Sequence, residues 1–393
     1  MRKEIAVLSF CMLGAQSMEA QDSLQVKENP HHLPFTKDTL RRSSVFPIPV
    51  VGYSPEKGFE FGVAALYSYY ADKKTPSLLT RNSTMAALVT FTTKQQFKLN
   101  FQTDNWTRNN DFHIKTNLRY HNFPVYYYGI GDTTHHADQS LIGNKRYKIS
   151  VEAEKRVTSH FYAGLSVTYQ HDKYTADNDK GIFPESSLVD KTGGYSTFLG
   201  VTGVYDNRDN QNYCTNGTYV RFNAAYAPSF LSKHPLWRFE VKASQFIPIT
   251  SKSTLGLNGL AQSLQGKTLP FYLLPELGND NIMRGYYTGR YRDQNYLAAQ
   301  AEYRYYVDPK IRIKLWFVDL QPTFALAGFA GTGTVFNNDG FSLSRLKPNY
   351  GLGIRYFYDK SARITVRLDY GWGEKRPGEK RQSGFYLSLS EAF

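Results

Sequence analysis

Residues 362–372 read ARITVRLDYGW and show the alternation that decides the fold. Successive side chains of a β-strand point to opposite faces, so every second residue from Ile364 onward is apolar or aromatic and shares one face. The other face carries Arg363, Arg367 and Asp369. A soluble β-sandwich would also alternate, but charges gathered on one face and aromatic residues at strand ends are typical of a membrane barrel with lipid outside and water inside.

The same pattern recurs from Val45 to the end of the chain, in segments of about ten residues that turn residues separate. It predicts an all-β fold, namely a transmembrane antiparallel β-barrel of about 16 strands. The expected strands are 45–53, 58–70, 82–93, 95–107, 111–121, 144–157, 160–173, 194–206, 217–228, 235–249, 252–265, 295–307, 320–336, 347–358, 361–372 and 382–393.

The lengths of the connections predict the orientation. If the first strand starts in the periplasm, the connection after each odd-numbered strand is extracellular and should be long. The longest gaps, 122–143, 174–193 and 266–294, all follow odd-numbered strands, whereas residues 157–160 and 250–252 form short turns on the other side. We therefore expect a bacterial outer-membrane barrel with three large external loops.

Composition agrees with a barrel and excludes other classes. Aromatic residues make up 15% of the chain, and the girdles of outer-membrane barrels require many of them. No run approaches the roughly 18 apolar residues of a spanning helix. The formal charge of +13 raises nucleic acid as a partner, but an exported protein with no long basic block favours outer-membrane lipids and lipopolysaccharide instead.

The N-terminal residues lie outside the alternating region. Residues 1–20 join Arg2 and Lys3 to an apolar core, which is typical of a secretory signal peptide. Residues 21–43 are polar and aperiodic, and they are interpreted as a flexible periplasmic lead-in. Residues 44–393 remain as the outer-membrane β-barrel.

The last segment has a pattern of its own. Phe385, Leu387 and Leu389 recur at every second position before Phe393. An apolar alternation that ends in an aromatic residue suits the strand that closes the barrel, because an unpaired edge in lipid leaves main-chain groups unsatisfied. We expect these four residues to form a barrel-closing C-terminal signal.

Residues 277–307 read LGNDNIMRGYYTGRYRDQNYLAAQAEYRYYV and join a charged, glycine-containing loop to an alternating strand. With several shorter stretches, they resemble the BamA/TamA superfamily, the bacterial surface antigen family of outer-membrane barrels. The resemblance covers roughly the whole mature chain and rests most on Arg284-Gly285-Tyr286 between the eleventh and twelfth expected strands. The other matching stretches are 46–47, 52–56, 123–124, 128–131, 204–209, 300–304, 351–356 and 367–370.

The resemblance implies a specific contact. In that family the sixth extracellular loop folds back into the lumen, and its arginine meets an acid on the barrel wall. By resemblance, Arg284 is that arginine, Gly285 lets the backbone turn beneath it, and Tyr286 completes the motif. Glu302 and Asp369 are its expected partners, since alternation points both inward and a confined guanidinium needs a carboxylate.

Two departures from the family pattern bear on function. The family often places a second acid on the thirteenth strand, where this chain has Gly331, so Asp369 gains importance. Assembly and secretion members carry periplasmic POTRA domains, and patatin-type members carry a lipase domain. The residues between the signal peptide and Ser44 are too few for either, which predicts a barrel-only member without POTRA domains.

Three functions compete. The first is a component or accessory of outer-membrane protein assembly or translocation, with partner proteins that supply periplasmic domains; its marks would be a lumen-inserted loop and an openable seam between the first and last strands. The second is a passive, anion-leaning channel, because four arginines point into the lumen: Arg304, Arg355, Arg363 and Arg367. An enzyme is not expected, since the chain has no Gly-x-Ser-x-Gly elbow and no convergent serine, histidine and acid.

Metals and cofactors are not expected either. The pairs His31-His32 and His135-His136 are sequence neighbours, and neighbouring side chains on a strand point to opposite faces. Cys214 is the only cysteine expected in the mature chain, so no internal disulfide can form.

Overall fold

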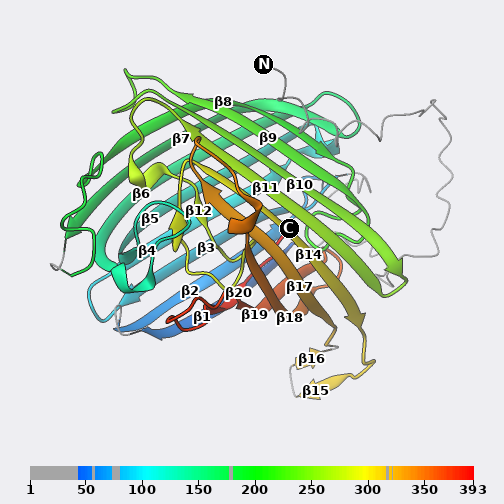
Figure 1. Ribbon diagram of the computed structural model, residues 1–393. Coiled ribbons are helices and arrows are strands. Elements are labelled where there is room, and N and C mark those ends of the chain that lie inside the picture. Colours follow the sequence, from blue (N-terminus) through cyan, green and yellow to red (C-terminus); the bar gives the residue numbers. More distant parts are fainter. Residues whose placement is uncertain (1–42, 55–57, 73–79, 177–179, 316–317, 321) are drawn as a thin grey trace.

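The computed structural model describes residues 43–54, 58–72, 80–176, 180–315, 318–320 and 322–393. These residues form a 16-stranded sheet in which every printed pairing is between antiparallel neighbours, and the sheet curls into a barrel (Figure 1). The predicted all-β transmembrane antiparallel barrel is confirmed. The expected signal peptide of residues 1–20, and the lead-in as far as residue 42, lie outside the described residues.

The barrel strands follow one another in chain order, each paired with the next. They are β1 (Ser44–Ser54), β2 (Gly58–Tyr69), β3 (Ser83–Thr92), β4 (Phe97–Trp106), β5 (Phe112–Tyr127), β6 (Ser140–Arg156), β7 (Phe161–Ala176), β8 (Gly193–Asp206), β9 (Gly217–Ala227), β10 (Leu236–Thr250), β11 (Ser253–Gln265), β14 (Asn295–Val307), β17 (Phe324–Phe336), β18 (Lys347–Asp359), β19 (Ile364–Trp372) and β20 (Ser383–Ser388).

Two small hairpins and four short helices lie in the connections of the described chain. The helices are single 3-10 turns, and none could cross a membrane as an apolar helix. The hairpins are β12 (Glu276–Leu277) with β13 (Tyr291–Arg292) and β15 (Ile313–Leu315) with β16 (Val318–Leu320); the helices are η1 (Arg108–Asn110), η2 (His136–Asp138), η3 (Phe271–Leu273) and η4 (Leu343–Arg345).

Two expected strand ends differ from the observed ones by more than four residues. The strand expected at 111–121 runs on to Tyr127 and includes Pro124, which lies opposite Gly143 of β6. Pairing with β4 ends at Asn122, so Pro124 sits where that edge of β5 is free and its missing N–H breaks no ladder bond. The strand expected at 382–393 ends at Ser388.

The two faces of the sheet differ as predicted. Outward side chains such as Leu165, Leu352 and Phe385 are 67%, 64% and 64% exposed, which suits contact with lipid. Inward positions carry buried polar side chains such as Gln170 and Asn223. Charge and amide groups therefore line the lumen, and apolar groups cover the outside.

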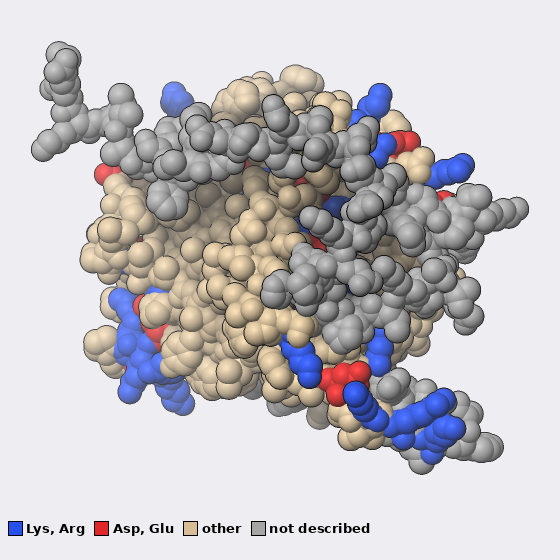
Figure 2. Space-filling model, turned by 90° about the vertical axis from the view of Figure 1, so that its right-hand side faces the viewer, with Lys and Arg blue, Asp and Glu red and all other residues tan. Residues whose placement is uncertain are grey.

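The barrel has a loop end and a turn end. The loop end carries the long connections that follow β5, β7 and β11, and the turn end carries the short ones that follow β6, β10 and β18. Figure 2 views the side that lies on the right in Figure 1, which is the turn end; lysine and arginine side chains stand out around its rim. The β15–β16 hairpin projects beyond the wall at this end (Figure 1).

The region between the first strand, β1, and the last strand, β20, is called the seam. Among the described residues β1 pairs only with β2, and β20 only with β19. The beginning of β1 instead contacts the end of β18: the Ser44 hydroxyl donates to Asp359 at 3.0 Å, and the Phe46 and Tyr358 rings stack at 4.0 Å. These contacts hold the β1 edge beside the end of β18, and no backbone pairing between β1 and β20 is present among the described residues.

Candidate functional site

The connection between β11 and β14 folds back inside the barrel. Its hairpin β12–β13 pairs Glu276 with Arg292, and β12 lies within the outline of the barrel in Figure 1. Apolar packing anchors the inserted loop, because its side chains join wall residues in one buried cluster. That cluster comprises Leu277, Ile282, Met283, Tyr286 and Tyr291 of the loop with Tyr296, Ala298 and Val335 of the wall.

Arg284 at the tip of this loop is fully buried against the wall. Its guanidinium donates to Glu302 of β14 at 2.5 Å and to Asp369 of β19. It also lies 3.5 Å from the centre of the Phe329 ring, where a cation is attracted to the aromatic face. The structure therefore brings together the arginine and the two acids that the sequence singled out.

Close main-chain contact allows this insertion. Gly285 has φ of 111°, and a Cβ there would lie 2.5 Å from the main chain of Trp372. Gly371 on β19 faces it, and a Cβ there would lie 2.7 Å from the carbonyl carbon of Arg284. Glycine is needed at both positions, since any side chain would push the loop off the wall.

At Gly331, where the family often has an acid, the main chain of β14 lies too close to leave room for a side chain. A Cβ on Gly331 would lie 2.6 Å from the carbonyl oxygen of Ala299 and 2.7 Å from Asn349. No side chain fits there without movement. Asp369 instead supplies the second carboxylate to Arg284.

The ion pair belongs to a larger buried group, which we call the latch cluster. Arg355 donates to Glu302 at 2.9 Å and also to Asp369, and Arg304 donates to Glu302 at 2.8 Å. Arg367 also pairs with Asp369, and Glu391 pairs with Arg304 and Arg355, so four guanidinium groups share three carboxylates. The latch cluster comprises Arg284, Arg304, Arg355, Arg367, Glu302, Asp369 and Glu391.

Because the latch cluster is buried, each of its charged side chains depends on the others for neutralisation. Six of its seven side chains are 0% exposed and Glu391 is 2% exposed. Removing a charge from water costs several kcal/mol, which excellent geometry and mutual pairing must offset. Loss of one carboxylate would leave several arginines uncompensated at once, so the loop tip, β14, β18 and β19 are held as a unit.

This geometry can be compared with that of known proteins. The sequence profile of the Omp85 superfamily domain matches residues 78–393. The chain belongs to the Omp85 superfamily. Comparison with curated protein sequences gives no match.

The fold is similar to that of solved structures. BamA from Haemophilus ducreyi lacking POTRA domains 1-3 aligns with a TM-score of 0.52 and 14% identity, over 88% of this chain and 69% of that one. CdiB from Escherichia coli gives 0.51 and 12%, over 88% and 61%. CdiB from Acinetobacter baumannii gives 0.48 and 11%, over 90% and 66%. At these identities the likeness concerns the fold.

The rest of the inserted loop ties this Omp85 barrel together at its loop end. The Tyr286 hydroxyl donates to the carbonyl of Pro348 at 2.7 Å and accepts from the main-chain N–H of Glu374 at 2.9 Å. Burial raises the pKa of Tyr286, so it stays a neutral donor. Arg290 donates to Thr134 at 2.8 Å, which joins the inserted loop to the connection between β5 and β6.

The C-terminal residues divide between two environments. Phe385 and Leu387 lie on β20 and face outward at 64% and 56% exposure. After Ser388 the chain turns into the lumen, where Leu389 packs on the cluster of Leu66, Ala362 and Ile364. Phe393 is buried beside Phe246, at 5.8 Å between ring centres. Phe393 does not continue the outward alternation that the sequence predicted.

This inward turn adds Glu391 to the latch cluster. Glu391 accepts from Arg355 at 3.2 Å, lies 3.6 Å from Arg304, and accepts from the Thr365 hydroxyl. Sequence reasoning missed it, because an alternating strand to Phe393 leaves no reason for the chain to bend. A glutamate after Ser388, in a stretch expected to be apolar, was the available signal.

Two other expectations about charged residues need adjustment. Arg363 was expected to line the lumen with Arg304, Arg355 and Arg367, but it lies in the β18–β19 turn and donates to Asp209 at 2.6 Å. His136 forms part of η2 and offers its main-chain N–H to Glu379. The pair His31-His32 lies outside the described residues.

Proposed function

We propose that this Omp85 barrel is a component or accessory of outer-membrane protein assembly or translocation. The observation that carries the proposal is the latch cluster, since it joins the inserted loop, through Arg284, and the segment after β20, through Glu391, to one buried network of ion pairs. A barrel used only as a passive pore has no need for an arginine latch beside its seam.

The seam supports the same role. β20 pairs with β19 over Arg367 to Trp372 only, and Ser388 is its last residue. The remaining edge of β19, and β1 beyond it, offer main-chain groups that another strand could pair with. The latch cluster would hold the rest of the wall in place while the seam admits a substrate strand.

The function would be exerted in the bacterial outer membrane, among lipids and lipopolysaccharide. Residues 1–20 are proposed to direct export. Partner proteins are proposed to supply periplasmic domains at the turn end, where Figure 2 shows a rim of basic side chains. The alternation of Phe385 and Leu387 is proposed to help β20 seat in the wall as a C-terminal signal, with Leu389 and Phe393 holding the inward turn.

Depletion in the source bacterium tests the proposal. Loss of the protein should lower the amounts of other folded outer-membrane barrels, scored by their heat-modifiable migration on gels. Wild type should restore them and Arg284→Ala should not, whereas Lys173→Gln, which removes an exposed outward charge, should restore them fully. Unchanged barrel levels after depletion would contradict an assembly role.

Two further measurements separate the alternatives. Purification in mild detergent should recover a partner with periplasmic domains if the protein is an assembly accessory. In planar bilayers, a large and stable conductance, combined with no effect on other barrels, would favour the channel.

A further inference from the structure

Some lumen cations of this barrel have no acidic partner. Most lumen arginines do: Arg146 pairs with Asp172, and Arg221 pairs with Glu152 and Glu240. Lys115 on β5 donates to the Tyr219 hydroxyl at 3.3 Å instead, and four other inward cations of the described chain lie within 4.0 Å of no carboxylate. These are Arg119 on β5, Lys148 on β6, and Arg238 and Lys242 on β10; the first three form what we call the cationic patch.

Arg119 and Lys148 lie directly opposite each other. They are register partners in the antiparallel β5–β6 pair, so both side chains leave the same face of the sheet. Directly opposed side chains have Cβ atoms about 4.5–5.5 Å apart, and like charges at that spacing destabilise a sheet. Both are half-buried in the lumen, where screening by water is weaker than on an open surface.

Arg238 reaches the same place from β10, three strands further along the wall from β7. Its guanidinium donates to the Thr168 hydroxyl of β7 at 3.3 Å. Thr168 lies opposite Ser150 of β6, two residues beyond Lys148 on the same face. The Ser150 hydroxyl donates to that of Thr168 at 3.1 Å, so the group that Arg238 contacts is tied directly to β6. Three positive groups from three strands therefore converge on one region.

The acids nearby are already engaged. Asp172 accepts from Arg146 and from Gln170, and Glu240 accepts from Arg221 and from Gln262. Asp280 of the inserted loop is half-exposed and lies 3.8 Å from Arg367. No described carboxylate forms an ion pair within 4.0 Å with any of the three cations of the patch.

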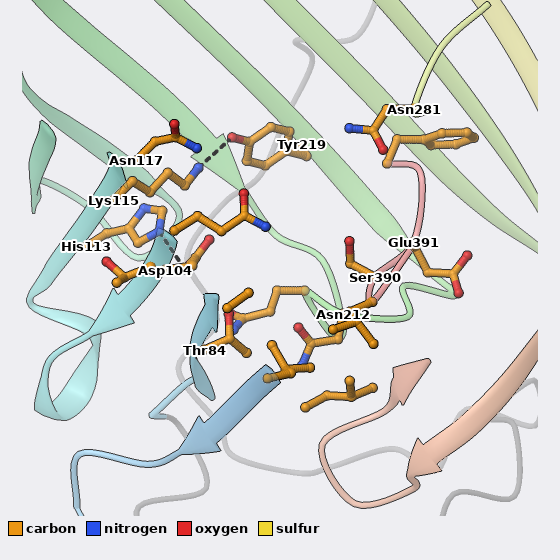
Figure 3. Close-up of a pocket in the computed structure, with 18 of the residues that line it drawn as sticks. Thr84, Asp104, His113, Lys115, Asn117, Asn212, Tyr219, Asn281, Ser390 and Glu391 are labelled. Carbon is orange, nitrogen blue, oxygen red and sulfur yellow. Dashed lines mark hydrogen bonds and ion pairs between the residues drawn. The ribbon is translucent and has the colours of Figure 1, made fainter. Parts of the chain in front are cut away.

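Open space borders the patch. A cavity of about 430 Å³ lies in the lumen, and Asn117, Ser150 and Lys242 line it. Asn117 precedes Arg119 by two residues on the same face of β5, and Ser150 follows Lys148 by two on β6. Figure 3 shows Lys115 and Asn117 directed into this space, with the segment of Ser390 and Glu391 on its far side.

We propose that the cationic patch binds a phosphate-bearing anion in the lumen. A guanidinium presents a planar fork of donors and an ammonium a point charge, and the two together suit the oxygens of a phosphate. Asn117 adds an amide donor at the border of the cavity. A ligand with two or more negative charges would relieve the repulsion between Arg119 and Lys148, which the chain itself leaves uncompensated. This inference goes beyond the proposed assembly role and does not depend on it.

Calorimetric titration of the purified full-length protein tests the site, with inorganic pyrophosphate as probe, in lipid-free non-ionic detergent at low salt. The double variant Arg119→Gln/Lys148→Gln should bind at least tenfold more weakly than wild type. The matched control is Lys145→Gln/Lys173→Gln, because these lysines are also direct register partners on β6 and β7 but are exposed on the outward face. The control should bind as wild type does.

A second arm identifies the source of the phosphate. Soluble short-chain phosphatidylglycerol replaces pyrophosphate in the same titration. If the lipid binds with the same dependence on Arg119 and Lys148 and pyrophosphate does not, the site takes a phospholipid headgroup. The conservative variant Arg119→Lys/Lys148→Arg should retain binding of whichever ligand is bound, and heat-modifiable migration confirms that each variant is folded. Failure of both probes to bind, or equal weakening in the two glutamine doubles, would overturn the proposal.

Discussion

Arg284 and Arg119 both point into the lumen of one barrel, yet their surroundings are opposite. Arg284 is fully buried, with two carboxylates and an aromatic ring around its guanidinium. Arg119 is half-buried, faces Lys148 across the strand pair, and has no described carboxylate within ion-pair distance. The first lies on the side of β14 to β19, the second on the side of β5 to β10.

The difference follows from what fills each side. The inserted loop and the segment after Ser388 exclude water from the first side, so an unpaired charge there would be costly. The cavity lies between the two sides, with Glu391 and Phe393 on its border, and it gives water or a ligand access to the charges of the second side. For Arg284 and Arg119, the difference in pairing therefore follows access to water, whereas Arg146 and Arg221 on the second side are paired. The first side is tied together by ion pairs, whereas the second side has room for the anion proposed above.

The largest contrast should come from removing one carboxylate on each side. Glu302→Gln leaves Arg284, Arg304 and Arg355 short of a partner and should destabilise the protein by about 3–5 kcal/mol, the usual cost of breaking a buried pair. Glu152→Gln removes a part-exposed partner of Arg221, which keeps Glu240, and should cost below about 1 kcal/mol. Urea unfolding in detergent measures both; similar losses would erase the distinction between the two sides.

Packing gives the next contrast. A Cβ on Gly353 would overlap the carboxylate of Asp369 and the guanidinium of Arg355, so Gly353→Ala should cost about 1–3 kcal/mol through overpacking. A Cβ on Gly203 of β8 would meet nothing closer than 3.7 Å, and Gly203→Ala should be neutral or slightly stabilising. Thermal unfolding midpoints of the two variants test this, and an equal drop would mean that the latch cluster is not tightly packed.

A smaller effect, of opposite sign, is expected on the open side. Arg119→Gln without ligand removes one of two opposed like charges and should leave stability unchanged or raise it by about 0.2–1 kcal/mol. The gain should shrink as salt is added, because screening weakens the repulsion in wild type. A clear loss of stability at low salt would show that Arg119 has a structural partner.

The smallest effect is a pH dependence at the loop end, outside both sides. Burial raises the pKa of Glu379, but the N–H of His136 and the charges of Arg290 and Arg376 lower it more, so the net pKa lies below its usual value. A carboxyl with a lowered folded pKa contributes stability above its unfolded pKa of about 4.3 and loses that contribution as the pH falls through the folded pKa. The difference in unfolding midpoint between wild type and Glu379→Gln should thus be present at pH 6 and vanish towards pH 3. A difference that is constant over this range would exclude ionisation as its cause.

Local pattern predicted the wall well and its ends less well. The alternation of residues such as Ile364 and Leu368 depends only on the strand period, which each segment carries in itself. The prediction ended the fifth strand at residue 121, but the strand runs on past Pro124, because a proline is tolerated where the neighbouring strand no longer pairs with that edge. Phe393 misled it for a related reason: its alternation is correct for a strand, but the preference of Glu391 for Arg355 and Arg304 draws the chain inward.

The sequence by itself determined the barrel, the inward face of each strand and the arginine at the tip of the inserted loop, since these depend on period-two alternation and on one short motif. Only the tertiary structure decided which charges meet. Arg284 lies 85 residues from Asp369, and Arg355 lies 53 from Glu302, so those contacts need barrel closure and strand register. The same register left Arg119 facing Lys148, because neighbouring strands bring side chains together without regard to their distance along the chain.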